Sequence, residues 1–419
     1  MPNWRIEPYD GITFYDYQKP HIKQERVWVA EEHGRYTFIP KHATHSIGIY
    51  TVLLEWDGLM LPQSRTIVSD LISSETVKGF LPAFRNGRRV VEEPIRLPKF
   101  RITSERFLKA QISSDEPITF DKPSPEKVTE TLFTVAGYSH TELSSTARYH
   151  NIFLERIGSI DNVQQYLAAS PYRELLELLS NNTDRGKVGW ILDKPSERRV
   201  LNHLHLCEML GKAVPPETKQ YINSVADFLP EEALHLLDRG ILERGFKLRC
   251  STCSYHAWYP AEHVGQTFEC TRCFKTQVYR SNPLWLYKLP EVIFQGFAHN
   301  MHVPLLALYN LKCKSQQCFE WIPDSDVFWV ADSEEKHRNV DILCLSDGRL
   351  YLGEAKSIDG IDREQFSFYE DICKRVPVDG MVFATSKFQW NRATLQRIEQ
   401  LKATFSGEII VLSRQDLYN

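Results

Sequence analysis

Three charged residues near the C-terminal end of the chain have the types and spacing that metal-dependent hydrolysis requires. Asp341, Glu354 and Lys356 lie in or beside two apolar runs that flank Asp347-Gly348. An Asp-Gly pair between such runs favours a two-residue type I′ hairpin turn. With this turn Asp341 lies directly opposite Glu354, where side chains share a face with Cβ atoms about 4.5–5.5 Å apart. Lys356 falls on the same face because side chains alternate along a strand.

Two carboxylates this close repel each other unless a cation lies between them or one of them holds a proton. Their oxygen atoms are ligands that suit Mg²⁺ or Mn²⁺. An ammonium group beside the metal can orient the attacking water and stabilise charge on a pentavalent phosphate. The spacing therefore predicts metal-dependent phosphodiester hydrolysis. The competing interpretation is an amphipathic hairpin whose charges face the solvent.

The same residues resemble a known signature. Asp341, Glu354 and Lys356 match the D-x(n)-E-x-K pattern of the PD-(D/E)xK nuclease superfamily, which has the restriction-endonuclease-like fold; Val340 stands in place of the proline. Around the hairpin, apolar patterns predict helices over 290–311, 362–375 and 390–404 and strands over 379–385 and 408–412. This order is similar to the superfamily core. The resemblance covers residues 286–419.

The resemblance implies roles for individual residues. Asp341 and Glu354 would hold catalytic Mg²⁺ or Mn²⁺, Lys356 would assist the attack, and the Ala355 carbonyl would be a backbone ligand. Glu291 is the candidate for the additional acid that many members carry on the first helix, although an acid in a first turn also suits the helix dipole.

A second element follows the lysine. Gln365 and Tyr369 are four residues apart and share a helix face. The pair resembles the Q-x3-Y element of the RecB-like branch, in which these residues lie beside the active site; a plain helix face is the alternative. Lys387 is a candidate phosphate contact by position, whereas His299 and His302 are expected to be ordinary structural histidines.

Four cysteines have the spacing of a metal site. Cys250, Cys253, Cys270 and Cys273 form a C-x2-C-x16-C-x2-C pattern, and two such knuckles supply the four thiolates that tetrahedral zinc prefers. With all four positions filled by protein the zinc is expected to be structural, within a zinc ribbon over 241–285. The zinc either stabilises a segment that is too short to form a core of its own, or the ribbon presents basic side chains to a nucleic acid.

The remaining cysteines predict no further metal site. Cys313 and Cys318 form a C-x4-C pair, but no partner pair follows them. Cys207, Cys344 and Cys373 are expected to be buried small hydrophobes.

The first 240 residues lie outside the resemblance. Runs of β-branched and aromatic residues over 26–29, 35–39 and 47–54 predict a β-rich domain over 1–112. Residues 84–109 carry eight Lys and Arg against three Glu, which makes them a phosphate-contact strip or a solvated face. Residues 113–127 contain three prolines and are interpreted as a linker. Apolar spacing over 163–179, 198–210 and 218–237 predicts a mainly helical domain over 113–240.

Composition and charge exclude several classes of protein. The chain has 419 residues, 42% apolar and 25% charged, which excludes disordered and collagen-like chains. A net charge of −4 argues against a histone-like polyanion coat. The N-terminus has no signal-peptide pattern and the cysteine count is odd, so a reducing cytoplasmic compartment is expected. No P-loop motif is present, so an ATPase would be a separate partner chain.

The sequence thus predicts a multidomain α/β and α+β protein that acts as a Mg²⁺-dependent nuclease. Its expected partner is nucleic acid, DNA in preference to RNA, with no membrane and with a homodimer as one arrangement for cutting two strands. The combination of domains is similar to bacterial restriction and anti-phage defence nucleases. The alternatives are a non-catalytic nucleic-acid-binding or scaffold protein and an RNase.

Overall fold

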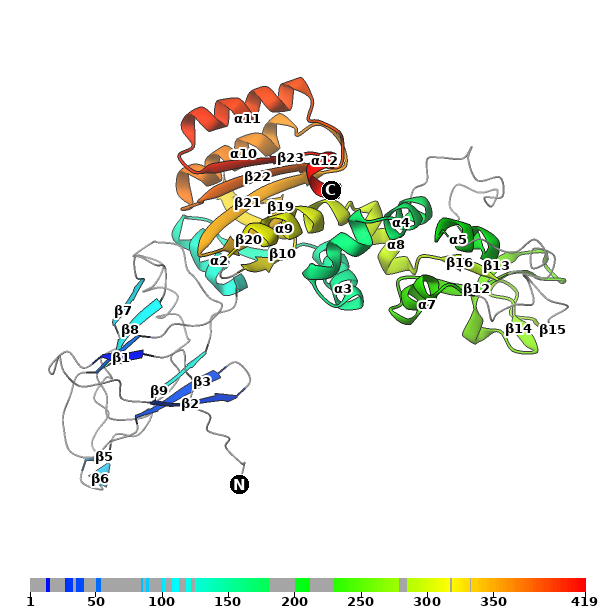
Figure 1. Cartoon of the computed structure of the whole chain (residues 1–419), viewed down its shortest axis with the longest axis horizontal. Coiled ribbons are helices and arrows are strands. Elements are labelled where there is room, and N and C mark those ends of the chain that lie inside the picture. Colours follow the sequence, from blue (N-terminus) through cyan, green and yellow to red (C-terminus); the bar gives the residue numbers. More distant parts are fainter. Residues whose placement is uncertain are drawn as a thin grey trace.

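The chain folds as a mixed α/β protein with several separate sheets (Figure 1). The computed structural model describes residues 125–180, 200–211, 229–278, 285–316, 319–331 and 333–419, together with short strands among the first 121 residues. Within these ranges no helix combines the length and the apolar character needed to cross a membrane.

The N-terminal strands form small antiparallel sheets. They are β1 (Thr13–Tyr15), β2 (Val27–Glu32), β3 (Arg35–Pro40), β4 (Tyr50–Leu53), β5 (Phe84–Arg85), β6 (Arg88–Arg89), β7 (Lys99–Ile102), β8 (Leu108–Ile112) and β9 (Ile118–Asp121). Their sheet orders are β1-β4-β8-β7, β2-β3-β9 and β5-β6. The predicted strands over 26–29, 35–39 and 47–54 are therefore confirmed in type. The side chains of the basic strip over 84–109 lie outside the described residues.

The linker interpretation of residues 113–127 is wrong in part. Strand β9 lies inside this segment, and helix α2 (Pro125–Val135) begins at its end. Pro125 opens the helix, where its missing N–H costs nothing. Pro125 therefore marks the start of a helix and is not part of a linker.

A five-stranded sheet in the order β17-β20-β21-β22-β23 organises the C-terminal part. The strands are β17 (Phe319–Ile322), β20 (Ile342–Ser346), β21 (Arg349–Lys356), β22 (Gly380–Thr385) and β23 (Glu408–Leu412). Strands β17, β20 and β21 are antiparallel, while β22 and β23 run parallel to β21. Because both faces are covered by helices, β20 and β22 are almost continuously apolar.

Alternate residues of the sheet enter two different cores. Ile342, Ala355 and Val382 pack with helix α9 (His302–Lys314) on one face. Leu343, Leu352 and Phe383 pack with α10 (Arg363–Arg375) and α11 (Arg392–Thr404) on the other. Helix α12 (Arg414–Tyr418) ends the chain beside α9. The sheet between α9 and the α10–α11 pair is visible in Figure 1.

The helix predicted over 290–311 is two helices. Helix α8 (Glu291–Ala298) ends before Asn300, whose φ of 61° is left-handed, and α9 starts at His302. Asparagine tolerates this conformation better than most residues. Pro304 then lies in the first turn of α9, where no intrahelical N–H donor is required. The apolar spacing continues through the break because both helices face the same core.

A β-hairpin interrupts the sheet between β17 and β20, and the sequence did not predict it. Strands β18 (Ser325–Ala331) and β19 (Glu334–Val340) pair with each other, and β18 also pairs with β10 (His140–Leu143). Strand β10 thus pairs with a hairpin that lies more than 180 residues later in the sequence. Local sequence patterns do not reveal such a pairing.

The helical elements before residue 240 share their core with the C-terminal part. They are α3 (Ala147–Ile157), a 3-10 turn (Ile160–Asn162), a π-helical turn (Gln164–Ala168), α4 (Tyr172–Ser180), α5 (His203–Met209) and α7 (Glu231–Asp238). Their buried residues pack in one cluster with α8 and α9. The domain boundaries predicted after residues 240 and 285 stay predictions. Side chains from both sides of each boundary pack in the same cluster.

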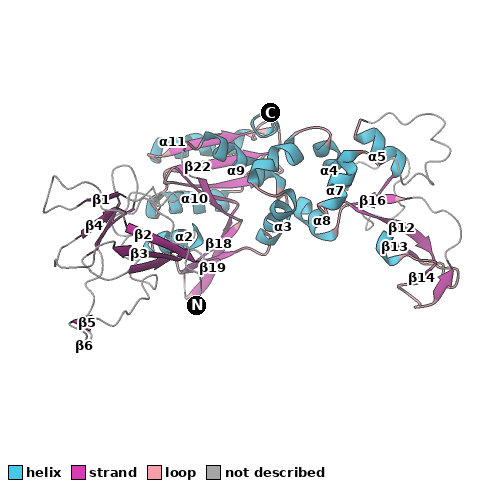
Figure 2. Cartoon of the chain, turned by 60° about the horizontal axis from the view of Figure 1, so that its bottom comes forward, coloured by secondary structure: helices cyan, strands magenta, loops and turns pink. Residues whose placement is uncertain are grey.

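The cysteine-bearing segment lies far from the five-stranded sheet. It contains β12 (Glu243–Arg249), β13 (His256–Pro260), a 3-10 turn (Ala261–His263), β14 (Thr267–Glu269) and β15 (Thr276–Val278). Strands β11 (Leu201–Asn202) and β16 (Leu286–Lys288) complete its larger sheet, in the order β11-β16-β12-β13. Both views place β12–β14 at the opposite end of the α3–α8 helices from β22 and α11 (Figures 1 and 2).

Candidate functional site

The hairpin that carries the acids has the predicted register. Ile342 pairs with Gly353, and Ser346 pairs with Arg349 across the turn. Asp347 and Gly348 have φ values of 49° and 71°. A type I′ turn needs positive φ at both central residues, so the turn and the register are confirmed.

Asp341 lies immediately before β20 and is anchored to the facing strand. The backbone N–H of Ala355 donates a hydrogen bond to its Oδ2 at 2.9 Å. Gly353, beside the site on β21, has no room for a side chain: a Cβ would lie 2.0 Å from the carbonyl oxygen of Val382. The close approach of β22 therefore fixes the strand segment that carries Glu354.

Glu354 is the centre of a polar network and is fully buried, at 0% exposure. Gln365 Nε2 donates to its Oε1 at 2.6 Å, and Tyr369 Oη donates to its Oε2 at 2.6 Å. Lys356 Nζ forms an ion pair with Oε1. This burial contradicts the interpretation that the hairpin charges simply face solvent.

Helix α10 positions the two donors. The Asp362 side chain caps the helix by accepting a hydrogen bond from the Gln365 N–H at 2.7 Å. One turn later, Tyr369 Oη also donates to the Gly353 carbonyl at 2.9 Å. The structure thus brings together five residues that the sequence pointed to: Asp341, Glu354, Lys356, Gln365 and Tyr369.

The low exposure of the two carboxyl groups disfavours their charged forms: Glu354 is buried and Asp341 is partly buried. Burial, followed by the charge of Glu354, raises the pKa of Asp341 well above its ordinary value. Burial also raises the pKa of Glu354, while Lys356 and hydrogen bonds from Tyr369 and Asp341 oppose that rise. The pKa values of both carboxyl groups are therefore raised in the folded chain.

Lys356 reaches solvent, with 28% of its side chain exposed. Burial lowers its pKa, but the charges of Glu354 and Asp341 outweigh burial and raise the pKa above its usual value. The ammonium form is therefore maintained at neutral pH.

A third acid, Asp324, was missed in the sequence. It is 6% exposed, accepts a hydrogen bond from Thr146, and its charge raises the pKa of Asp341. Its Oδ1 is buried without a hydrogen-bond partner among the residues that the structure describes. Asp324 follows a proline between two apolar runs, which is an ordinary turn signal, and so nothing local marks it as part of a site.

Asp324 does not complete a tight cluster with the other two acids. Among described residues, the cysteines are the one group of three or more metal-ligating side chains whose ligand atoms all lie within 4.8 Å of one another. Asp324 therefore acts on the pair through its charge at somewhat longer range.

Other predicted residues lie elsewhere. Glu291 starts α8 and accepts a hydrogen bond from Gln295 at 2.8 Å, and it is not among the main charges acting on Asp341. His299 stacks on Tyr149, and burial lowers the pKa of His302 to about 4. Both histidines have the structural surroundings expected of them.

The four cysteines of the ribbon converge. Their sulfur atoms lie within 4.8 Å of one another, with Cys250–Cys273 and Cys253–Cys270 separations of 3.5 and 3.6 Å. These distances are too long for disulfides and suit thiolates around one ion. The cluster can hold a zinc ion.

Two equivalent turns present these cysteines. In each turn the first cysteine carbonyl accepts an N–H bond from the residue four positions on, Ser254 or Phe274, at 2.9 Å. Both of those residues have a φ of 57°. Gln277 Nε2 donates to Cys250 Sγ at 2.8 Å, a contact that orients a metal-binding thiolate.

The remaining cysteines divide by burial. Cys207 and Cys344 are buried and Cys373 is partly buried, as expected of small apolar side chains. Cys313 is exposed, and Cys318 lies outside the described residues.

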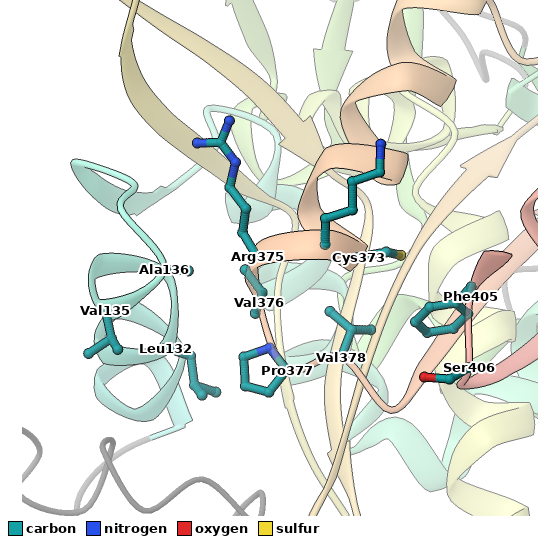
Figure 3. A pocket seen from close by; sticks show the side chains of 11 residues that line it. Leu132, Val135, Ala136, Cys373, Arg375, Val376, Pro377, Val378, Phe405 and Ser406 are labelled. Carbon is teal, nitrogen blue, oxygen red and sulfur yellow. The ribbon is translucent and has the colours of Figure 1, made fainter.

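A surface cavity lies apart from the acids. It has a volume of about 470 Å³ and is lined by residues of α2, of the end of α10 and of the segment after α11 (Figure 3). Val378 in its wall precedes β22, whereas Lys356 pairs with Thr385 at the end of β22. The cavity and the acids therefore lie toward opposite ends of this strand.

Comparisons with known proteins give no family. No family model and no curated protein matches the chain. Among solved structures, the crystal structure of protein VC1899 from Vibrio cholerae is similar with a TM-score of 0.31 and 11% identity, over 77% of this chain. The match spans 66% of that protein's own length.

Proposed function

We propose that this chain is a Mg²⁺- or Mn²⁺-dependent nuclease whose residues 286–419 have a restriction-endonuclease-like fold. The observation that carries the proposal is the buried Glu354, which interacts with Asp341, Lys356, Gln365 and Tyr369 at the end of two adjacent strands. Such a costly arrangement of charges is typical of a functional site.

The donor set fits a hard divalent cation. Asp341 and Glu354 offer oxygen atoms from two facing strands, and Mg²⁺ commonly uses one or two carboxylates while keeping several waters. The pKa values of both carboxyl groups are raised in the folded chain, and a cation between the groups would favour their charged forms. Bound metal supplies Lewis-acid stabilisation of the phosphate and a more acidic water.

The other side chains have separable tasks. Lys356 remains protonated, so its ammonium group acts as a hydrogen-bond donor and positive charge toward a phosphate instead of as a base. Gln365 and Tyr369 each hold one oxygen of Glu354 and so fix the orientation of that carboxylate.

We take DNA as the substrate in preference to RNA and restriction or anti-phage defence as the setting. The support is the resemblance of the Asp341, Glu354 and Lys356 pattern, which stands without a matching family model. A separate ATPase and a homodimer remain part of the proposal. The zinc-loaded ribbon would serve as a structural module on the same chain.

The test is to incubate the full chain with a plasmid and, in parallel, with an RNA, in Mg²⁺, Mn²⁺ or EDTA. Metal-dependent cleavage of the plasmid supports the proposal, and cleavage of RNA alone would reassign the substrate. Asp341→Ala, Glu354→Ala and Lys356→Ala should each abolish cleavage. Glu364→Ala, a surface acid 83% exposed on α10, is the matched control and should cleave normally.

A further inference from the structure

Two exposed apolar side chains, Phe388 and Ile358, lie on loops at the same sheet edge as the lysine of the proposed site. Phe388 is 82% exposed and Ile358 is 57% exposed. Ile358 follows the end of β21 by two residues, and Phe388 follows the end of β22 by three. Because Lys356 pairs with Thr385 where these strands end, both apolar side chains lie on loops that leave the same edge of the sheet as the lysine.

The two loops are bonded into one rigid surface. Ser386 N–H donates to the Lys356 carbonyl at 3.1 Å, and Thr385 Oγ1 donates to the Ile358 carbonyl at 2.7 Å. Further along, Asn391 N–H donates to the Asp359 carbonyl at 2.7 Å. The Phe388 loop is therefore tied to the Ile358 loop on both sides of Phe388.

Both ends of the Phe388 loop are also anchored to the body of the protein. Trp390, two residues after Phe388, is 2% exposed in the core beneath α10 and α11. Arg414 N–H donates to the Lys387 carbonyl at 2.8 Å. The backbone that carries Phe388 toward solvent is thus held on both sides, so little backbone freedom is lost when a ligand binds there.

A cation lies near the ring. The Arg414 guanidinium lies 5.6 Å from the centre of the Phe388 ring, and the exposed Lys387 is its chain neighbour. An aromatic face with flanking cations suits a nucleobase whose phosphates contact the cations. Two apolar side chains are too few for a specific protein interface, which takes about 20–30 residues on each side.

We propose that Phe388 stacks on an unpaired base next to the phosphate that Lys356 contacts, so the enzyme prefers a single strand or frayed end at the cut. A base paired within a duplex is already stacked on both sides and cannot offer its face to Phe388. This inference rests on the proposed nuclease function and names its substrate class. Ile358 fills the space beside the displaced base, and Lys387 and Arg414 hold the adjoining phosphates.

The experiment measures binding of a fluorescein-labelled oligo(dT) strand to the full chain by anisotropy without added Mg²⁺ or Mn²⁺, so that the proposed cleavage is absent and zinc stays on the four cysteines. A matched duplex oligonucleotide is measured in parallel. Stacking on an aromatic side chain changes affinity by about 10-fold to 100-fold per base. Phe388→Ala should weaken oligo(dT) binding by that factor and should leave duplex binding nearly unchanged.

Two further variants separate stacking from simple apolar contact. Phe388→Tyr keeps the aromatic face and should bind oligo(dT) like the parent chain, whereas Phe388→Leu keeps only the apolar volume and should bind as weakly as Phe388→Ala. Leu395→Ala, 39% exposed on α11, is the surface control and should change nothing. Because Phe388 is so exposed, none of its variants removes core packing.

The outcomes distinguish this inference from the proposed function. Unchanged oligo(dT) binding in Phe388→Ala, or full binding by Phe388→Leu, would overturn the stacking proposal even if the parent chain cleaves a plasmid. If oligo(dT) binding depends on Phe388 but the chain cleaves no nucleic acid, the stacking proposal is supported and the nuclease proposal is contradicted. A parent chain that binds no oligonucleotide would contradict both.

Discussion

The four-cysteine ribbon and the acid site around Glu354 differ in how close together their residues lie in the sequence. The ribbon draws its ligands from two tight turns within 24 residues, from Cys250 to Cys273, and its own core has four buried apolar side chains. The acid site lies between two larger cores and draws its side chains from two strands, a helix and the turn at Asp324, within the 46 residues from Asp324 to Tyr369.

The two sites are also held together in different ways. We expect the ribbon to depend on a bound ion, because so small a core cannot hold the segment together. The acid site depends on the surrounding fold, which keeps two carboxyl groups together although they repel each other. The ribbon should therefore lose structure when its ligands are removed, whereas the acid site should lose function and gain stability.

The largest effect is expected from removing ribbon cysteines. Cys270→Ala combined with Cys273→Ala should abolish zinc binding, which supplies about 10–16 kcal/mol in isolated zinc modules. The segment from β12 to β15 should then unfold. Zinc content measured by mass spectrometry and limited trypsin digestion report the two effects. The exposed Cys313→Ala is the control, and a double variant whose ribbon remains protected would contradict the dependence on metal.

The next largest effect is loss of activity without loss of stability at Asp341. Asp341→Asn should reduce Mg²⁺-dependent cleavage by about 10³-fold, because several kcal/mol of metal-derived stabilisation disappear. Asp379→Asn is a matched control: Asp379 also accepts a backbone N–H bond on β21, from Leu350 at 2.9 Å, but at the other end of the strand.

The same variant should unfold at a higher temperature in EDTA. The pKa of Asp341 is higher in the folded chain than in the unfolded chain, so the folded state binds more protons between the two values. Stability of the metal-free protein therefore falls as pH rises through the folded pKa. A tenfold difference in the proton affinity of Asp341 between the folded and unfolded chains corresponds to about 1.4 kcal/mol of unfolding free energy. An asparagine in this position cannot lose a proton, so the Asp341→Asn chain does not lose this stability as pH rises. Equal melting temperatures for both chains above neutral pH would argue against a strained acid pair.

A smaller effect is expected from Tyr369→Phe. Losing the hydroxyl leaves buried oxygens of Glu354 and Gly353 without their donor, which costs about 1–3 kcal/mol in chemical unfolding. Since the Tyr369 hydrogen bond lowers the pKa of Glu354, the acidic limb of the cleavage profile should move to higher pH. Tyr351→Phe, which loses a bond to Glu408 at the opposite end of β21, should leave the profile in place.

The smallest effect is expected from Asp324→Asn. The charge of Asp324 raises the pKa of Asp341, so its removal should shift the acidic limb to lower pH, opposite to Tyr369→Phe. The Mg²⁺ concentration for half-maximal cleavage should rise about 10-fold, as for second-sphere partners of a metal. Asp326→Asn, two residues further along the chain on β18, is the control. A change in the same direction as Tyr369→Phe would show that Asp324 acts in another way.

The local parts of both sites follow from the sequence, and the long-range parts do not. Cysteine spacing and the Asp347-Gly348 turn each fix geometry within a few residues, so the knuckles and the Asp341–Glu354 pairing could be predicted. Asp324 could not, because its place depends on the β18–β19 hairpin and on pairing with β10. The turn at Asn300 was missed because the apolar pattern continues across it.

In the proposed site Glu354 holds a divalent cation for phosphodiester cleavage. Plasmid nicking by the full chain in Mg²⁺ and in EDTA tests it most directly, with Glu354→Gln beside the surface control Glu364→Gln. Cleavage by the parent and Glu364→Gln chains in Mg²⁺ only, with none by Glu354→Gln, is the expected result. Cleavage by Glu354→Gln at the parent rate would contradict the account.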